Sequence, residues 1–335
     1  ARQQRLRDDY LRRERLRDLI PVADARRNRR PRPASQIAPA AHTGRLVFPD
    51  FDIADVEPFI DWNFFFPAWG LKGRCPDLFD HPERGDEARK LFDDAQALLH
   101  RIADERLLTL QGVVGIYPAV SRGDDILLTD AKGRRHTLPM LRNQTRGAEN
   151  LCLSDFIADR RDGATDYIGA FALTAGIGLQ ELCDKFRSEG DDYSAIMAKL
   201  LADRLTEAFA EALHRYARVT LWGYEREGQW SVGDLLAEKY QGIRPAFGYP
   251  SAPDHSLKAD VFALMDVGTV TGMTMTESYM IVPGEAACGL MLGHPEARNF
   301  SVGRIDSEQL ASYAARRGTD PEKMRVLIPQ HLIDM

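Results

Sequence analysis

The longest helical pattern in the chain is DDYSAIMAKLLADRLTEAFAEALHRYAR, residues 191–218. Asp191 or Asp192 can cap its start, because a carboxylate at that position accepts hydrogen bonds from backbone N–H groups that lack a partner in the helix. Apolar side chains recur every three or four residues, which predicts one long amphipathic helix. Its apolar face would consist of Ile196, Met197, Leu200, Leu201, Leu205, Phe209, Ala212, Leu213 and Tyr216.

Shorter patterns surround this helix on both sides. We expect further helices at residues 86–105, 232–240, 259–267, 306–317 and 320–328. We expect strands at residues 112–120, 124–130, 166–175, 274–282 and 286–292. These elements do not alternate as β–α–β units. Their order therefore favours an α+β fold with a mostly antiparallel sheet.

The composition limits the class of protein. The chain has 335 residues, 44% of them hydrophobic, enough for one large domain or two small ones with a substantial core. No apolar run approaches the roughly 20 residues that a membrane-spanning helix needs, and the Arg-rich N-terminus is no secretory signal. Four widely spaced cysteines argue against a disulfide scaffold or a zinc site. We therefore expect reduced thiols in a cytoplasmic protein that has no membrane partner.

Charge separates the N-terminus from the rest. Residues 1–34 contain 12 Arg and 5 acidic residues, whereas the remainder carries a balance of −13. Residues 1–20 have the pattern of a charged helix, and the prolines that follow predict an extended connector up to about residue 45. We expect residues 1–45 to be a helix and linker and residues 46–335 to be the compact domain. The acidic body argues against a nucleic-acid partner.

The common catalytic motifs are missing. The sequence has no Gly-rich dinucleotide or phosphate loop, no H-E-x-x-H and no G-x-S-x-G. One loop, EKYQGIRPAFGYP (238–250), has a composition that suits a charged ligand. Arg244 can bind a carboxylate with two hydrogen bonds, Gly248 permits close approach of the backbone, and Tyr249 can face a cation. An ordinary Pro/Gly loop with an ion-paired arginine remains the alternative.

Other candidate residues also allow two interpretations. The aromatic block at 62–69 is more typical of a core than of a ligand site. Asp61 could cap a helix or meet a ligand ammonium group. Glu207 on the long helix would ordinarily be a solvated surface residue.

Many ordered blocks between about Phe59 and Tyr313 nevertheless resemble one family, the C-terminal activation domain of cobalamin-dependent methionine synthase. The resemblance implies a C-shaped single domain with a central bent, mostly antiparallel sheet flanked by helices. The clearest blocks are IDWNFFFPAWGLKG (60–73), GVVGIYPA (112–119), DYIGAFALTAG (166–176), the long helix, EKYQGIRPAFGYPSAPDH (238–255) and GHPEARNFSVGRI (293–305).

The same resemblance implies a site for S-adenosylmethionine (AdoMet). The family's R-x-x-x-G-Y motif corresponds to the segment from Arg244 through Pro245, Ala246 and Gly248 to Tyr249. Arg244 would hold the methionine carboxylate, the backbone around Ala246 would meet the adenine, and Tyr249 would pack near the ligand.

Residues outside the motif would complete this site. Asp61 would accept from the ligand's ammonium group, and Glu207 and Glu238 match acidic positions along the same groove. The family usually carries two adjacent aromatic residues after its H-P pair, but this chain has Asn299 followed by Phe300. Asn299 therefore takes the place of the first aromatic residue, and Phe300 matches the second.

The resemblance also implies a function in methionine biosynthesis. The domain would place AdoMet over the cobalamin-binding domain of methionine synthase, and flavodoxin or a flavoprotein reductase would supply an electron to reactivate the cobalamin. No catalytic acid or base and no metal ligand is expected in this chain, and residues 1–45 would follow the cobalamin domain. The alternatives are a stand-alone reactivator of a separate corrinoid protein and a non-catalytic AdoMet-binding module.

Overall fold

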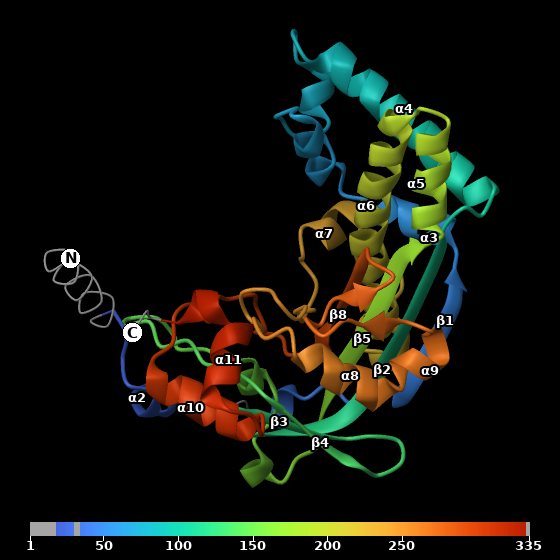
Figure 1. The fold of residues 1–335 in the computed structure, drawn as a ribbon. Coiled ribbons are helices and arrows are strands. Elements are labelled where there is room, and N and C mark those ends of the chain that lie inside the picture. Colours follow the sequence, from blue (N-terminus) through green and yellow to red (C-terminus); the bar gives the residue numbers. More distant parts are fainter. Residues whose placement is uncertain (1–17, 30–33, 333–335) are drawn as a thin grey trace, which may run out of the picture.

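The computed structural model describes residues 18–29 and 34–332. Most of the charged helix predicted at residues 1–20 lies outside these ranges. The ribbon in Figure 1 follows a C, with α4–α6 in one arm and α10, α11 and the β3–β4 hairpin in the other. Both the mixed α+β class and the C shape predicted from the sequence are confirmed.

A sheet in which every pairing is antiparallel connects the two arms. Its strands run in the order β4 (Arg135–Pro139), β3 (Asp125–Thr129), β2 (Thr109–Arg122), β5 (Asp166–Ile177) and β8 (Ala286–Met291). Strand β1 (Gly44–Phe51) pairs with the first half of β2, and β3 pairs with its last four residues. A separate small hairpin joins β6 (Thr274–Met275) and β7 (Ile281–Val282).

Strand β2 is buried on both faces, which explains its almost continuous apolar sequence. Alternate side chains enter different cores, because successive residues of a strand point to opposite faces. Val114 and Ile116 belong to one hydrophobic cluster, whereas Val113 and Tyr117 belong to the other. The sheet therefore separates two cores.

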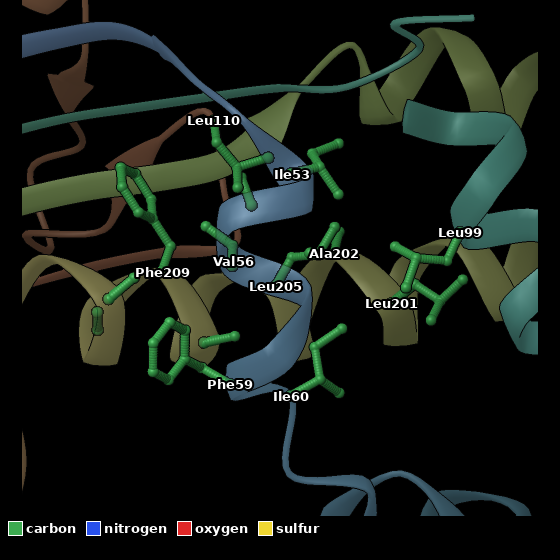
Figure 2. Packing of buried hydrophobic residues seen from close by; sticks show 14 of the residues in the cluster. Ile53, Val56, Phe59, Ile60, Leu99, Leu110, Leu201, Ala202, Leu205 and Phe209 are labelled. Atoms are coloured by element: carbon green, nitrogen blue, oxygen red, sulfur yellow. The ribbon is translucent and has the colours of Figure 1, made fainter. Parts of the chain in front are cut away.

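The long helix α6 (Asp192–Tyr216) fills the first core. It packs with α4 (Gly85–Asp104), α5 (Leu179–Ser188) and the short helix α3 (Ile53–Val56). Figure 2 shows Val56 of α3 between the α6 side chains of Leu205 and Phe209 and the side chain of Leu110 on β2. Asp191 caps α6 by accepting from the backbone N–H of Ser194, as its position predicted.

The second core lies on the other face of the sheet. It contains residues of α8 (Leu257–Met265) and α9 (Val267–Thr271). A third, smaller cluster is formed around α10 (Ser307–Arg316) and α11 (Pro321–Leu327). Between the cores, α7 (Val232–Leu236) and the loop that follows it lie beside β8 (Figure 1).

The segment before β1 differs from the extended connector expected from its prolines. Helix α2 (Val22–Arg27) forms directly after Pro21, and Leu19, Val22 and Ala25 are buried. Arg26 reaches Asp124 and Arg29 reaches Asp155, two carboxylates that also pair with the buried Arg142, and Arg29 reaches Asp159 as well. We call this group the arginine clasp: Arg26, Arg29 and Arg142 with Asp124, Asp155 and Asp159.

Among the described residues, six α-helices and β-strands were not predicted from the sequence, namely α2, α3, α5, α9, β1 and β4, and two other elements are shorter than expected. Strand β1 contains Pro49 and has a register shift after Phe48, which hides its alternation, and β4 is a short edge strand. Helix α5 has a regular helical pattern that was overlooked. Helix α7 ends at Leu236, and the strand expected at 274–282 is the β6–β7 hairpin. All four cysteines are free, as expected.

Candidate functional site

Two adjoining hollows form a groove beside α6. Their volumes are about 710 Å³ and 350 Å³, and the two share Glu207, Glu238, Arg244 and Tyr249 in their walls. Nine of the ten residues predicted for the site line this groove, which brings together segments far apart in the sequence. The nine are Asp61, Glu207, Glu238, Arg244, Pro245, Ala246, Tyr249, Asn299 and Phe300.

The loop that carries most of these residues is bonded to the sheet. The backbone N–H groups of Ile243 and Phe247 donate to the carbonyls of Leu292 and Cys288, each at 3.0 Å. Leu290 N–H donates to the Pro245 carbonyl at 3.0 Å. A Cβ at Gly289 would lie 2.3 Å from that carbonyl oxygen, so only glycine permits the approach. The loop thus continues the sheet beyond β8.

Arg244 occupies the inner wall of the groove. Its side chain is 20% exposed, and its Nη1 donates to Glu211 and, at 2.6 Å, to the Tyr240 hydroxyl. Burial opposes the positive charge, but Glu211, Tyr240 and the other nearby carboxylates together outweigh it and raise the pKa of Arg244 above its ordinary value. The groove therefore contains a permanent cation suited to a carboxylate.

Acidic side chains also line the groove. Tyr249 is 56% exposed, and its hydroxyl lies 3.5 Å from Glu207 Oε1. The charge of Glu207, followed by burial, raises the pKa of Tyr249. Glu238 accepts from the amide of Asn299 at 3.2 Å, so the residue that replaces an aromatic still contacts the site. Together these carboxylates suit a cationic group of the ligand.

Asp61 lies in the smaller hollow and also caps a helical turn. Its Oδ1 accepts from the backbone and side-chain amides of Asn63, at 3.0 and 2.8 Å. No residue that the structure describes donates a hydrogen bond to Oδ2. The capping role and the ligand role are thus compatible, since each would use a different oxygen.

Gly248 is the exception among the predicted residues, because it does not line the groove. It has a φ of +98°, and an added Cβ would lie 2.0 Å from the ring of His255. The glycine makes room for that histidine, and its predicted contact with a ligand stays a prediction. His255 in turn forms part of the wall of the larger hollow.

Sequence reasoning also missed several polar residues of the groove. Glu211, Tyr240 and Lys258 line it beside His255. Glu211 follows Glu207 by one helical turn, so a shared helix face could have identified it. Lys258 donates to the Tyr279 carbonyl at 3.1 Å, and burial lowers its pKa. Within residues 18–29 and 34–332, no cluster of three or more potential metal ligands occurs.

Comparisons with known proteins agree with this arrangement. A family described as the activation domain of vitamin B12-dependent methionine synthase matches residues 52–318. The chain belongs to that family. Its fold is also that of a solved structure, the crystal structure of the MetH reactivation domain bound to AdoHcy. The two share 38% sequence identity and a TM-score of 0.89, over 94% of this chain and 98% of the other.

Membership defines the general role of the chain. It is an activation domain of a methyl-transferring synthase, and the cobalamin of such a synthase belongs to other domains. Membership in this family implies a cobalamin domain as a neighbour. None of the helices in the described part of this activation domain is long and apolar enough to cross a membrane.

Proposed function

We propose that this activation domain binds AdoMet in the groove and positions its methyl group for the reductive methylation of cob(II)alamin. The observation that carries the proposal is the presence of a partly buried arginine and of acidic side chains in the same groove. AdoMet has one carboxylate and two cationic groups, an ammonium and a sulfonium, and the groove has complementary charges for all three. The AdoHcy bound to the similar reactivation domain differs from AdoMet by this methyl group.

Each part of the ligand has a partner of matching chemistry. Arg244 would hold the carboxylate, and Asp61 would accept from the ammonium group. Glu207 and Glu238 would stabilise the positive end of the molecule. Pro245 and Ala246, which the sheet holds in an extended conformation, would present backbone groups to the adenine, with Tyr249 and Phe300 as aromatic walls.

The reaction needs little chemistry from this chain. Cobalamin, held by the neighbouring domain, supplies the metal that accepts the methyl group after one-electron reduction by a donor such as flavodoxin or a flavoprotein reductase. The carbon–sulfur bond breaks, its electron pair stays on sulfur, and a neutral thioether leaves. No proton moves, so the groove's residues bind and orient AdoMet and act through position.

Residues 1–45 would then connect the domain to its cobalamin partner, and a covalent connection raises the local concentration of that partner. The cytoplasmic location expected from the sequence also stays a prediction. A stand-alone reactivator of a separate corrinoid protein would use the same groove, and a non-catalytic AdoMet-binding module would lack the methyl transfer.

One experiment separates methyl transfer from AdoMet binding alone. The purified chain is mixed with a cobalamin domain in the cob(II)alamin state, a reductant and AdoMet, and absorbance is followed for conversion to methylcobalamin. We expect conversion that depends on this chain and is absent when AdoHcy replaces AdoMet. Calorimetric binding of AdoMet without any conversion would support the non-catalytic module instead, and absence of AdoMet binding would refute the proposal.

A further inference from the structure

A group of buried polar residues lies directly behind Arg244. We call it the buried cluster, and it consists of Glu211, His214, Arg218, Glu225 and Tyr240. Glu211 is 3% exposed, and His214 and Arg218 are 0% exposed. Buried charges and hydrogen-bonding groups cost free energy unless they are paired, so such a group needs a structural or functional reason.

The buried cluster holds one side of the Arg244 guanidinium. Nη1 of Arg244 donates to Glu211 Oε2 and to the Tyr240 hydroxyl, which itself donates to Glu211 Oε2 at 3.2 Å. Nε and Nη2 of Arg244 donate to no residue within the described ranges, although the side chain lines both hollows of the groove. Nη1 therefore anchors the Arg244 guanidinium to the buried cluster. Nε and Nη2 remain available to hydrogen-bond to a ligand in the groove.

Glu211 lies close to two arginines, Arg218 and Arg244, but hydrogen-bonds to Arg244. The second buried arginine, Arg218, has its own carboxylate, since its Nε donates to Glu225 at 2.8 Å and its guanidinium stacks 3.7 Å from the ring of Tyr240. Glu211 Oε1 lies 3.6 Å from Arg218 Nη2, beyond hydrogen-bond distance. Glu211 is thus the carboxylate that hydrogen-bonds to Arg244.

His214 adds no compensating negative group. Burial, together with Arg218 and Arg244, lowers the pKa of His214 well below its ordinary value, so the ring is neutral. Its ring packs edge-on against Tyr240 at a centroid distance of 5.1 Å. Without Glu211, the Arg244 guanidinium would keep only the Tyr240 hydroxyl as a hydrogen-bond partner among the residues that the structure describes.

We propose that Glu211 is a positioning residue for carboxylate recognition: it holds Nη1 of Arg244 so that Nε and Nη2 face the α-carboxylate of AdoMet. This inference rests on the proposed function and deepens it. Glu211 does not touch the ligand but acts through Arg244. Its effect should therefore depend on the ligand's carboxylate and on no other part of the ligand.

The test combines a protein variant with a ligand that lacks one group. Glu211→Gln keeps the size of the side chain but removes its charge, and decarboxylated AdoMet keeps the adenosine, sulfonium and ammonium groups. By calorimetry, the variant should bind AdoMet roughly tenfold more weakly than the original chain, since a charged hydrogen bond becomes neutral. It should bind decarboxylated AdoMet with a change below about threefold.

Two control variants complete the design. Glu181→Gln, an exposed change on α5, should alter neither affinity. Glu211→Asp retains the charge and should recover part of the loss for AdoMet. Equal weakening of both ligands in Glu211→Gln would assign Glu211 a general structural role and overturn the proposal, as would tighter binding of AdoMet. If the original chain bound neither ligand, the proposed function itself would fail.

Discussion

The arginine clasp and the groove both bring arginines into contact with buried carboxylates, but they satisfy the guanidinium groups to different degrees. In the clasp, Arg142 makes four hydrogen bonds from three nitrogens, to Asp124, Asp155 and the Asn150 carbonyl, at 2.6–2.8 Å. In the groove, Arg244 uses Nη1 alone for its contacts with described residues. A saturated arginine stabilises the fold, whereas an arginine with unused donors can bind something else.

The largest effect is expected when the saturated arginine is removed. Arg142→Ala would leave the buried Asp124 and Asp155 with Arg26 and Arg29 as their remaining ion-pair partners among the described residues. We expect the free energy of unfolding to fall by about 3–5 kcal/mol, the usual result of breaking a buried ion pair. Urea denaturation of this variant measures the loss. A loss below about 1 kcal/mol would show that the clasp contributes little to stability.

Removal of Arg244, the arginine of the groove, should weaken ligand binding strongly and lower stability only a little. Arg244→Ala removes a charged, two-bond contact and should weaken AdoMet binding by about 2–4 kcal/mol, as measured by calorimetry. Its urea midpoint should change much less than that of Arg142→Ala. Unchanged AdoMet affinity would refute the assignment of Arg244 to the ligand carboxylate. The contrast between a stabilising Arg142 and a ligand-binding Arg244 would then fail.

Acid should act on the clasp through Asp159. Hydrogen bonding from the Arg161 side chain outweighs burial and lowers the pKa of Asp159 from 3.8 to about 2, with further help from Arg29. A carboxyl group whose pKa is lower in the folded state contributes stability above its unfolded pKa and loses it as pH falls through the folded value. Stability should therefore decline between about pH 4 and pH 2.

Asp159→Asn is the matching variant for this pH prediction. It should be less stable than the original chain at pH 6 and should show a shallower decline on acidification, in urea titrations at each pH. An identical slope for both proteins would mean that Asp159 does not contribute to the acid dependence.

The smallest effect is expected at the edge of the groove. Asp61→Asn keeps an oxygen for the cap to Asn63 but removes the charge that would meet the ligand ammonium. AdoMet affinity should fall by about 1 kcal/mol, a typical value for a partly exposed charged contact, with little change in melting temperature. A drop in melting temperature without any loss of affinity would leave Asp61 with the capping role alone.

The sequence predicted those residues of the groove that lie where a local pattern and a family motif coincide. The spacing of the long helix predicted α6, and the loop around Arg244 predicted a carboxylate site. Glu211 was missed because an acidic residue on a helix is ordinarily solvated, and its burial depends on Tyr240 and Arg244 from a distant loop. Gly248 was assigned to a ligand because nothing local indicates that His255 occupies the space beside it.

The clasp was missed for the same physical reason. Prolines around α2 indicate an extended chain, but the carboxylates that bind Arg26 and Arg29 lie about 100 residues or more away in the sequence. Long-range ion pairs leave no periodic pattern, so composition suggested a linker where the chain is packed. The origin of residues 1–45 beside a cobalamin domain remains a prediction.

The bonding of the groove loop to β8 has a consequence for solubility. Strand β8 ends the sheet, and an uncovered edge strand offers unpaired N–H and C=O groups to other molecules. Residues 243–247 cover that edge with backbone hydrogen bonds, made possible by Gly289. A side chain at position 289 would displace residues 243–247 from the edge of β8. The exposed edge would make the protein more prone to aggregation, and the displaced loop would no longer form the ligand groove.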